Sequence, residues 1–111
     1  MEKDIDVWLS DIQQAITEIN QFLPEPKIYQ IFQSDLKARR AIERNLEIIG
    51  EAVNRVLSHN PNISISNSRK IVDKRNRISH GYDSVSDEII WAIVIRHLPL
   101  LQIEIEALRK K

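Results

Sequence analysis

An arginine and a histidine five positions apart are the residues of this sequence whose types and spacing best suit catalysis. The stretch RNRISHGY, residues 75–82, begins with Arg75 and Asn76 and contains His80. Arginine makes forked, permanently charged contacts to phosphate, and histidine can accept or donate a proton near neutral pH. These residue types indicate chemistry on a phosphate group.

The two arginines of this stretch are expected to face different surroundings. On a helical wheel at 100° per residue with Ile71 at 0°, Arg75 falls at about 40°, within the apolar stripe, and Arg77 at about 240°, on the wet side. An inward arginine needs an anionic partner or a watery cleft, because an unpaired buried charge is costly. Either a functional cleft or an intramolecular ion pair with Glu47 or Glu51 explains Arg75.

Length and composition predict a single domain over residues 1–111 without structural staples. The chain has 111 residues, no cysteine, and 16 basic against 16 acidic residues, so the net charge does not steer it toward nucleic acid in bulk. Charge is uneven, however: residues 69–80 carry five basic residues and one acid, and residues 1–22 carry five acids and one lysine. The longest apolar run, residues 89–95, is too short to span a bilayer. We expect a soluble cytoplasmic protein, with no metal site, no cofactor and no binding to membrane or DNA.

Apolar residues recur at helical spacing and predict an all-α, up-and-down bundle of four main helices. The expected ranges are about 4–22, 35–58, 68–79, and from 84 or 86 to 109 with a kink at Pro99. The expected core stripes are Ile5, Trp8, Ile12, Ile16 and Ile19 on the first helix, and Ile42, Leu46, Ile49, Val53 and Val56 on the second.

A few further residues bear on how the helices pack. Residues 89–95 are apolar all round a helix, which predicts burial on every side and, in so small a domain, a partner chain. Trp91 is expected in the core, and Asn45 lies at the edge of the second stripe. His59 and His97 are expected to be ordinary residues near helix ends rather than ligands.

The stretch 75–82 resembles the Arg-Asn-x-x-x-His motif of the HEPN ribonucleases, which are helical domains of prokaryotic defence and toxin systems. It is similar in particular to the HepT-type toxins, which pair with a minimal nucleotidyltransferase antitoxin, MntA, and whose motif extends to His-x-Tyr. Similar stretches occur along nearly the whole chain: DVWLSDIQQAI, RAIERNLEIIGEA, DSVSDEIIW and HLPLL. One departure is Ser68, where many relatives have an aromatic residue before the third helix.

The resemblance implies that Arg75 and His80 are catalytic and that Asn76 supports them. It implies metal-independent RNA cleavage, in which the ribose 2′-hydroxyl attacks the adjacent phosphate and leaves a cyclic phosphate and a free 5′-hydroxyl. It also implies that Tyr82 accepts AMP from the cognate antitoxin and that this modification silences the toxin, as in a type VII-like toxin–antitoxin system. A homodimer that apposes two third helices would bring two His80 and two Arg75 side chains into one cleft.

A second function remains open at this level. A HEPN-type binding module could keep the fold and partner a nucleotidyltransferase without cutting RNA. The intact spacing from Arg75 to His80 favours the enzyme.

Overall fold

The structure is a computed structural model that describes residues 3–63, 65 and 87–110. Over these residues the regular structure is entirely helical, which confirms the predicted all-α class. The elements are α1 (Lys3–Phe22), α2 (Tyr29–Ser34), α3 (Leu36–His59), α5 (Asp87–Ala92), a π-helical segment η1 (Ile93–His97) and α6 (Leu98–Arg109). The expected third helix, residues 68–79, and the expected start of the fourth at 84 or 86 lie outside the described residues.

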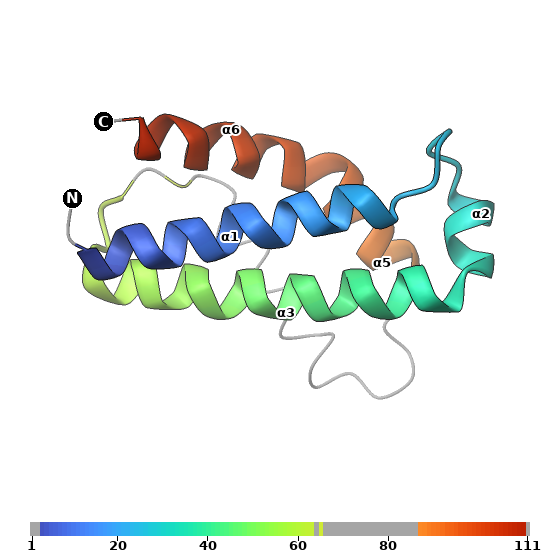
Figure 1. The fold of residues 1–111 in the computed structure, drawn as a ribbon, viewed down its shortest axis with the longest axis horizontal. Coiled ribbons are helices and arrows are strands. Elements are labelled where there is room, and N and C mark those ends of the chain that lie inside the picture. The colour runs from blue at the N-terminus through green and yellow to red at the C-terminus, as the bar shows by residue number, and fades with distance from the viewer. Residues whose placement is uncertain (1–2, 64, 66–86, 111) are drawn as a thin grey trace.

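The two long helices α1 and α3 lie side by side and run antiparallel (Figure 1). Their facing stripes are those that the apolar spacing predicts, with Ile12, Ile16 and Ile19 on α1 and Ile42 and Ile49 on α3 almost fully buried. Residues three or four apart share one helix face, so each stripe presents a continuous apolar surface. This contact forms the centre of the core.

The start of α3 is set by a side-chain cap. Asp35 has an extended backbone, and its Oδ1 accepts a hydrogen bond from the backbone N–H of Ala38 at 3.1 Å. Such a cap satisfies one of the backbone donors left free in the first turn of a helix. The observed helix begins and ends one residue after the predicted range 35–58.

The connection between α1 and α3 contains a short helix that is not among the four predicted ranges. In this helix, α2, Phe32 is fully buried. Tyr29 and Phe32 pack against Trp91 of α5, with ring centroids 6.0 and 5.1 Å from the Trp91 ring. The six residues of α2 are too few to show a helical period, and their place is decided by these contacts with α5.

The last part of the chain bends where the sequence predicts a kink. Pro99 lies in the first turn of α6, and η1 immediately precedes it. The N–H of Leu98 bonds to the carbonyl of Ile93, five residues back, instead of four. Proline lacks an N–H and crowds the carbonyl four residues before it, so the helix widens by one residue just before the proline.

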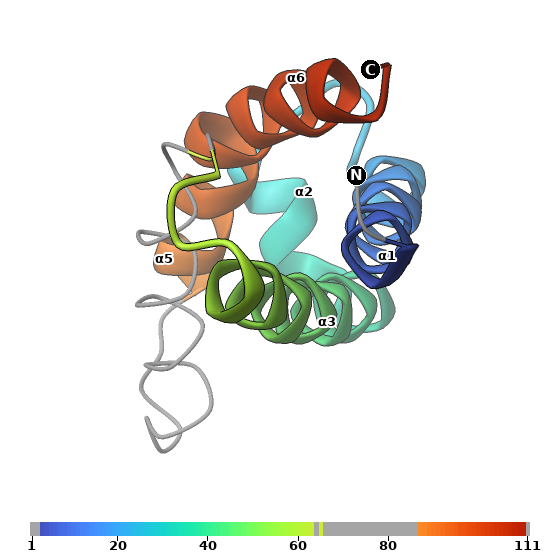
Figure 2. The same ribbon diagram turned by 90° about the vertical axis from the view of Figure 1, so that its left-hand side faces the viewer.

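The end-on view shows α6, α1, α3 and α5 arranged around a common interior (Figure 2). In the apolar run 89–95, Ile90, Ile93 and Val94 are buried in this interior, and Trp91 is half-buried. Ile95 remains 37% exposed. The single chain therefore buries most of the run but not its whole circumference.

Candidate functional site

The four residues of the predicted site, Arg75, Asn76, His80 and Tyr82, lie outside the described residues. Arg77, expected on the wet side of the same helix, lies outside them as well. What the structure describes is the framework to which both ends of this part of the chain are joined.

On the N-terminal side, the chain is held to the core shortly before the motif. Ile65 is 5% exposed and belongs to the same apolar cluster as the α1 and α3 stripes. Its backbone N–H donates to the carbonyl of Ile63 at 3.0 Å. The attachment is therefore apolar and lies ten residues before Arg75 in the sequence.

On the C-terminal side, the chain is held by an ion pair. Asp87, five residues after Tyr82, accepts hydrogen bonds from Nη1 of Arg39 at 3.1 Å to Oδ1 and 3.2 Å to Oδ2. The two side chains are 26% and 21% exposed, so solvent screens the pair only partly. The pair joins the first turn of α3 to the first turn of α5 across 48 positions of sequence. Sequence reasoning did not identify it, because charged residues of both signs are frequent and no local pattern pairs these two.

A carboxylate on the next turn of α3 borders this pair. Burial raises the pKa of Glu43 above its ordinary value, Arg40 and Arg39 lower it, and Asp87 and Glu47 raise it further. The pKa of Glu43 is therefore raised mainly because its carboxylate loses hydration, while the charges around it act in both directions.

Asn45 is the buried polar side chain among the described residues, with 5% exposure. Its Nδ2 donates to the carbonyl of Ala41 at 3.0 Å, within its own helix. Asn45, which the sequence places at the edge of the α3 stripe, is thus buried, and its amide nitrogen bonds to a carbonyl of its own helix.

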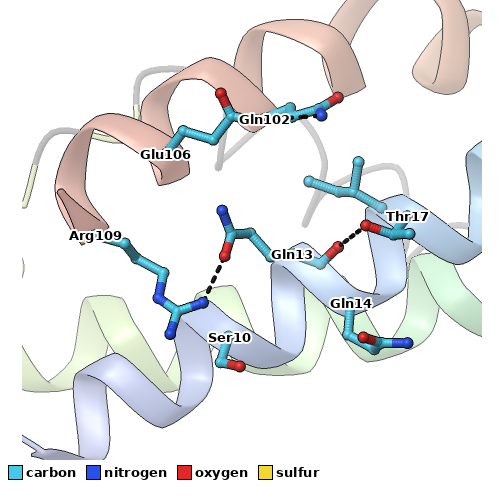
Figure 3. A pocket seen from close by; sticks show the side chains of 8 residues that line it. Ser10, Gln13, Gln14, Thr17, Gln102, Glu106 and Arg109 are labelled. Atoms are coloured by element: carbon cyan, nitrogen blue, oxygen red, sulfur yellow. Dashed lines mark hydrogen bonds between the residues drawn. The ribbon is translucent and has the colours of Figure 1, made fainter.

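A polar groove lies between α1 and α6 and has a volume of about 340 Å³ (Figure 3). Its one cation, Arg109, is already engaged: Nε donates to Asp6 at 3.1 Å and Nη1 donates to Gln13. The other polar lining residues are amides, hydroxyls and Glu106. With its cation neutralised, the groove presents no charge that would attract an anion.

A second pocket lies where the start of α1 meets the end of α3. It is lined by Trp8, which the sequence predicts to be a core residue. Trp8 packs against the core but is only half-buried. Its ring meets that of His59 at 4.8 Å between centroids and 73° between planes. The spacing on α1 indicates the stripe, but it cannot show that Trp8 lies at the edge of the α1–α3 contact rather than within it.

Neither a metal site nor a membrane-spanning helix is found in the part of the chain that the structure describes. Over residues 3–63 and 87–110, three or more histidine, aspartate or glutamate side chains nowhere gather in a way that could hold a metal ion. In the same part of the chain, none of the helices combines the length and apolar character needed to cross a membrane.

The bundle formed by the described residues has the all-α architecture of a HEPN-type domain. The sequence profile of the family described as Ribonuclease HepT-like matches residues 12–108. A probable ribonuclease HepT of Thermococcus cleftensis is 32% identical over 99% of this chain and 100% of its own length. A candidate RNase of Methanocaldococcus jannaschii is 32% identical over 98% of this chain and 90% of its own length. No match was found among solved structures. The chain belongs to the HepT-like ribonuclease family.

We expect the free energy of unfolding to depend more on the Arg39–Asp87 ion pair than on a second, more exposed long-range ion pair. Arg39→Gln or Asp87→Asn should each lower the free energy of unfolding by roughly 1–2 kcal/mol, because each leaves a partly buried charge without its partner. The double variant should cost less than the sum of the two single variants, because the two residues are coupled. Chemical denaturation followed by circular dichroism measures all three.

The matched control is Arg109, whose pair with Asp6 is also long-range but more exposed, at 31% and 51%. Arg109→Gln should cost less than about 1 kcal/mol. Equal losses for Arg39→Gln and Arg109→Gln, or strict additivity in the Arg39–Asp87 double variant, would contradict the assignment.

Proposed function

We propose that this chain is a metal-independent endoribonuclease and the toxin component of a type VII-like toxin–antitoxin pair. The observation that carries the proposal is the match to the HepT-like ribonuclease family over residues 12–108, a range that contains the complete Arg75-to-His80 motif. The spacing of the motif and the basic balance of residues 69–80 support RNA as the substrate.

In the proposed reaction the ribose 2′-oxygen attacks the adjacent phosphorus atom. A general base accepts the 2′-hydroxyl proton, the bond from phosphorus to the 5′-oxygen breaks, and a general acid protonates that oxygen. The products are a 2′,3′-cyclic phosphate and a free 5′-hydroxyl. His80 performs the proton transfers, Arg75 stabilises the negative charge that develops on the phosphate, and Asn76 supports the two.

A homodimer supplies both an acid and a base, since one chain has one histidine in the motif. A two-fold axis brings the same residues of two protomers to one place, so a shared cleft would hold two His80 and two Arg75 side chains. The partial exposure of Ile95 at 37%, next to buried Ile93 and Val94, supports an interface that includes this part of the chain.

His80→Ala and Arg75→Ala should each reduce RNA cleavage by roughly 10²-fold or more, as expected on loss of an acid–base group or of a charge at the reacting phosphate. Arg77→Ala should reduce it much less, because the helical wheel places this side chain in solvent. EDTA should leave the activity unchanged. Purified protein is incubated with total RNA, the products are separated by gel, and their termini are analysed for cyclic phosphate.

The outcome also separates the two candidate functions. Absence of cleavage by the wild-type chain, with its fold intact, would favour the non-catalytic binding module. Full activity of His80→Ala, or strict dependence on an added divalent metal, would refute the mechanism.

The proposed interface can be tested at Ile95. Ile95→Glu should convert the dimer to a monomer, because it places a charge in an apolar contact. Val7→Glu is the matched control, since Val7 is also exposed, at 49%, but lies on α1 and not in the run 89–95. Light scattering at micromolar concentration gives the mass of each. A monomeric wild-type chain, or equal dissociation by both changes, contradicts the interface.

The proposed regulator is an MntA-type nucleotidyltransferase that transfers AMP from ATP to the hydroxyl of Tyr82, with release of pyrophosphate. The new phosphodiester would compete with RNA for Arg75 through the same charge-assisted contacts, and the adenosine would block the cleft by its bulk. Modification therefore silences the enzyme without unfolding it.

Tyr82→Phe should keep the fold and most of the ribonuclease activity but escape silencing by the antitoxin. Intact-mass spectrometry after incubation with ATP, magnesium and the cognate nucleotidyltransferase measures the addition of AMP. Tyr29→Phe is a suitable control, because Tyr29 is the other tyrosine of the chain and packs against Phe32 and Trp91. If Tyr82→Phe gains AMP as the wild type does, the acceptor is another residue.

A further inference from the structure

The pocket at the junction of α1 and α3 combines an aromatic surface with a cation and an amide. It has a volume of about 380 Å³ and is lined by Trp8, Asn54, Arg55, Ser58 and His59. Its volume falls in the lower part of the range of about 300–1,000 Å³ for small-molecule sites. The four residues from α3 share one face of the helix, since they lie three or four positions apart.

The two rings of the pocket form a corner. The ring planes of Trp8 and His59 meet at 73° with centroids 4.8 Å apart. A flat aromatic ligand in such a corner can stack on one ring and turn its edge to the other, and both arrangements are favourable for aromatic pairs. The corner therefore suits a planar aromatic group rather than an aliphatic one.

The polar groups of the pocket are suited to the remaining parts of a nucleotide. Arg55 is exposed, and no hydrogen bond or ion pair connects its side chain to another described residue. Its guanidinium is thus available for a phosphate. Asn54 is exposed and offers both a donor and an acceptor to the edge of a base. None of the five lining residues is acidic.

The surroundings restrict how the phosphate can lie. The last carbonyls of α3 carry partial negative charge beside His59, and Asp4 and Asp11 lie on the same side of α1 as Trp8, at four and three positions from it. Both features disfavour a phosphate near α1 or at the end of α3. The phosphate is therefore placed at Arg55, one turn before the end of α3, with the base in the corner of Trp8 and His59.

We infer that this pocket binds one nucleotide of a single-stranded RNA substrate, outside the catalytic motif. The inference rests on the proposed ribonuclease function. Stacking on aromatic side chains beside a cation is how proteins bind single-stranded RNA with little sequence preference. Such a contact binds substrate and transition state equally, so it raises affinity without changing the chemical step.

The test uses a labelled, single-stranded oligonucleotide with 2′-O-methyl riboses, which cannot be cleaved through the 2′-oxygen. Trp8→Ala and Arg55→Gln should each weaken its binding, measured by fluorescence anisotropy, by about 5- to 100-fold, the range for loss of one stacked base. Arg44→Gln should have little effect. Arg44 lies on the same side of α3 as Arg55, eleven residues or about 16.5 Å away, is 72% exposed and pairs with Glu47.

Steady-state cleavage and intrinsic fluorescence give independent readouts. In cleavage of RNA, Trp8→Ala and Arg55→Gln should raise KM at unchanged kcat. The oligonucleotide should quench the tryptophan fluorescence of the wild type, and the quenching should disappear in Trp8→Phe, where Trp91 remains packed against Tyr29 and Phe32. Circular dichroism of each variant shows whether it is folded.

Each alternative outcome has one meaning. Binding and KM unaffected by Trp8→Ala and Arg55→Gln overturn the inference but leave the proposed function intact. Oligonucleotide binding that depends on Trp8 and Arg55, without cleavage of RNA by the wild type, supports the subsite and overturns the proposed function. Equal quenching by free AMP and by the oligonucleotide overturns the assignment to RNA. Dependence on Trp8 but not on Arg55 overturns the assignment to a nucleotide.

Discussion

The apolar contact between α1 and α3 is the constraint on which the rest of the molecule depends. Side chains such as Ile12, Ile16 and Ile49 are removed from water almost completely, and each fully buried aliphatic side chain of this kind contributes about 1.5–3 kcal/mol. Neither helix could bury its stripe alone, and helices of this length gain most of their stability from such packing. In the folded chain α6 lies against α1, and the start of α1 lies beside the end of α3 (Figure 1).

The start of α5 is attached to α2 and α3 by two different kinds of interaction. The aromatic rings of Phe32 and Trp91 contribute area and shape, whereas Arg39 and Asp87 contribute direction. Packing between rings tolerates small shifts, but a charged hydrogen bond is sensitive to both distance and angle. The combination fixes the start of α5 against α2 and α3, five residues after Tyr82 in the sequence.

The two pockets show why charge must be considered together with its partners. The groove between α1 and α6 and the pocket at Trp8 each contain one arginine and have similar volumes. In the groove, Arg109 is neutralised by Asp6. In the pocket, Arg55 is exposed and none of the lining residues is acidic. Only the second pocket therefore offers an uncompensated charge beside an aromatic surface, although composition alone gives no reason to distinguish them.

The sequence by itself determined the class of the fold, the long helices to within one residue, the bend near Pro99 and the residue types of the candidate site. These features are local: a helical period, a cap and a proline act within a few positions of the chain. The arrangement of Arg75, Asn76, His80 and Tyr82 stays a prediction, because they lie outside the described residues. Only the tertiary structure decided that residues 29–34 form a helix, that Arg39 pairs with Asp87, and that Trp8 lies at the rim of the core beside His59. Each of these depends on residues distant in sequence, because burial and charge pairing follow from proximity in space, which no local pattern specifies.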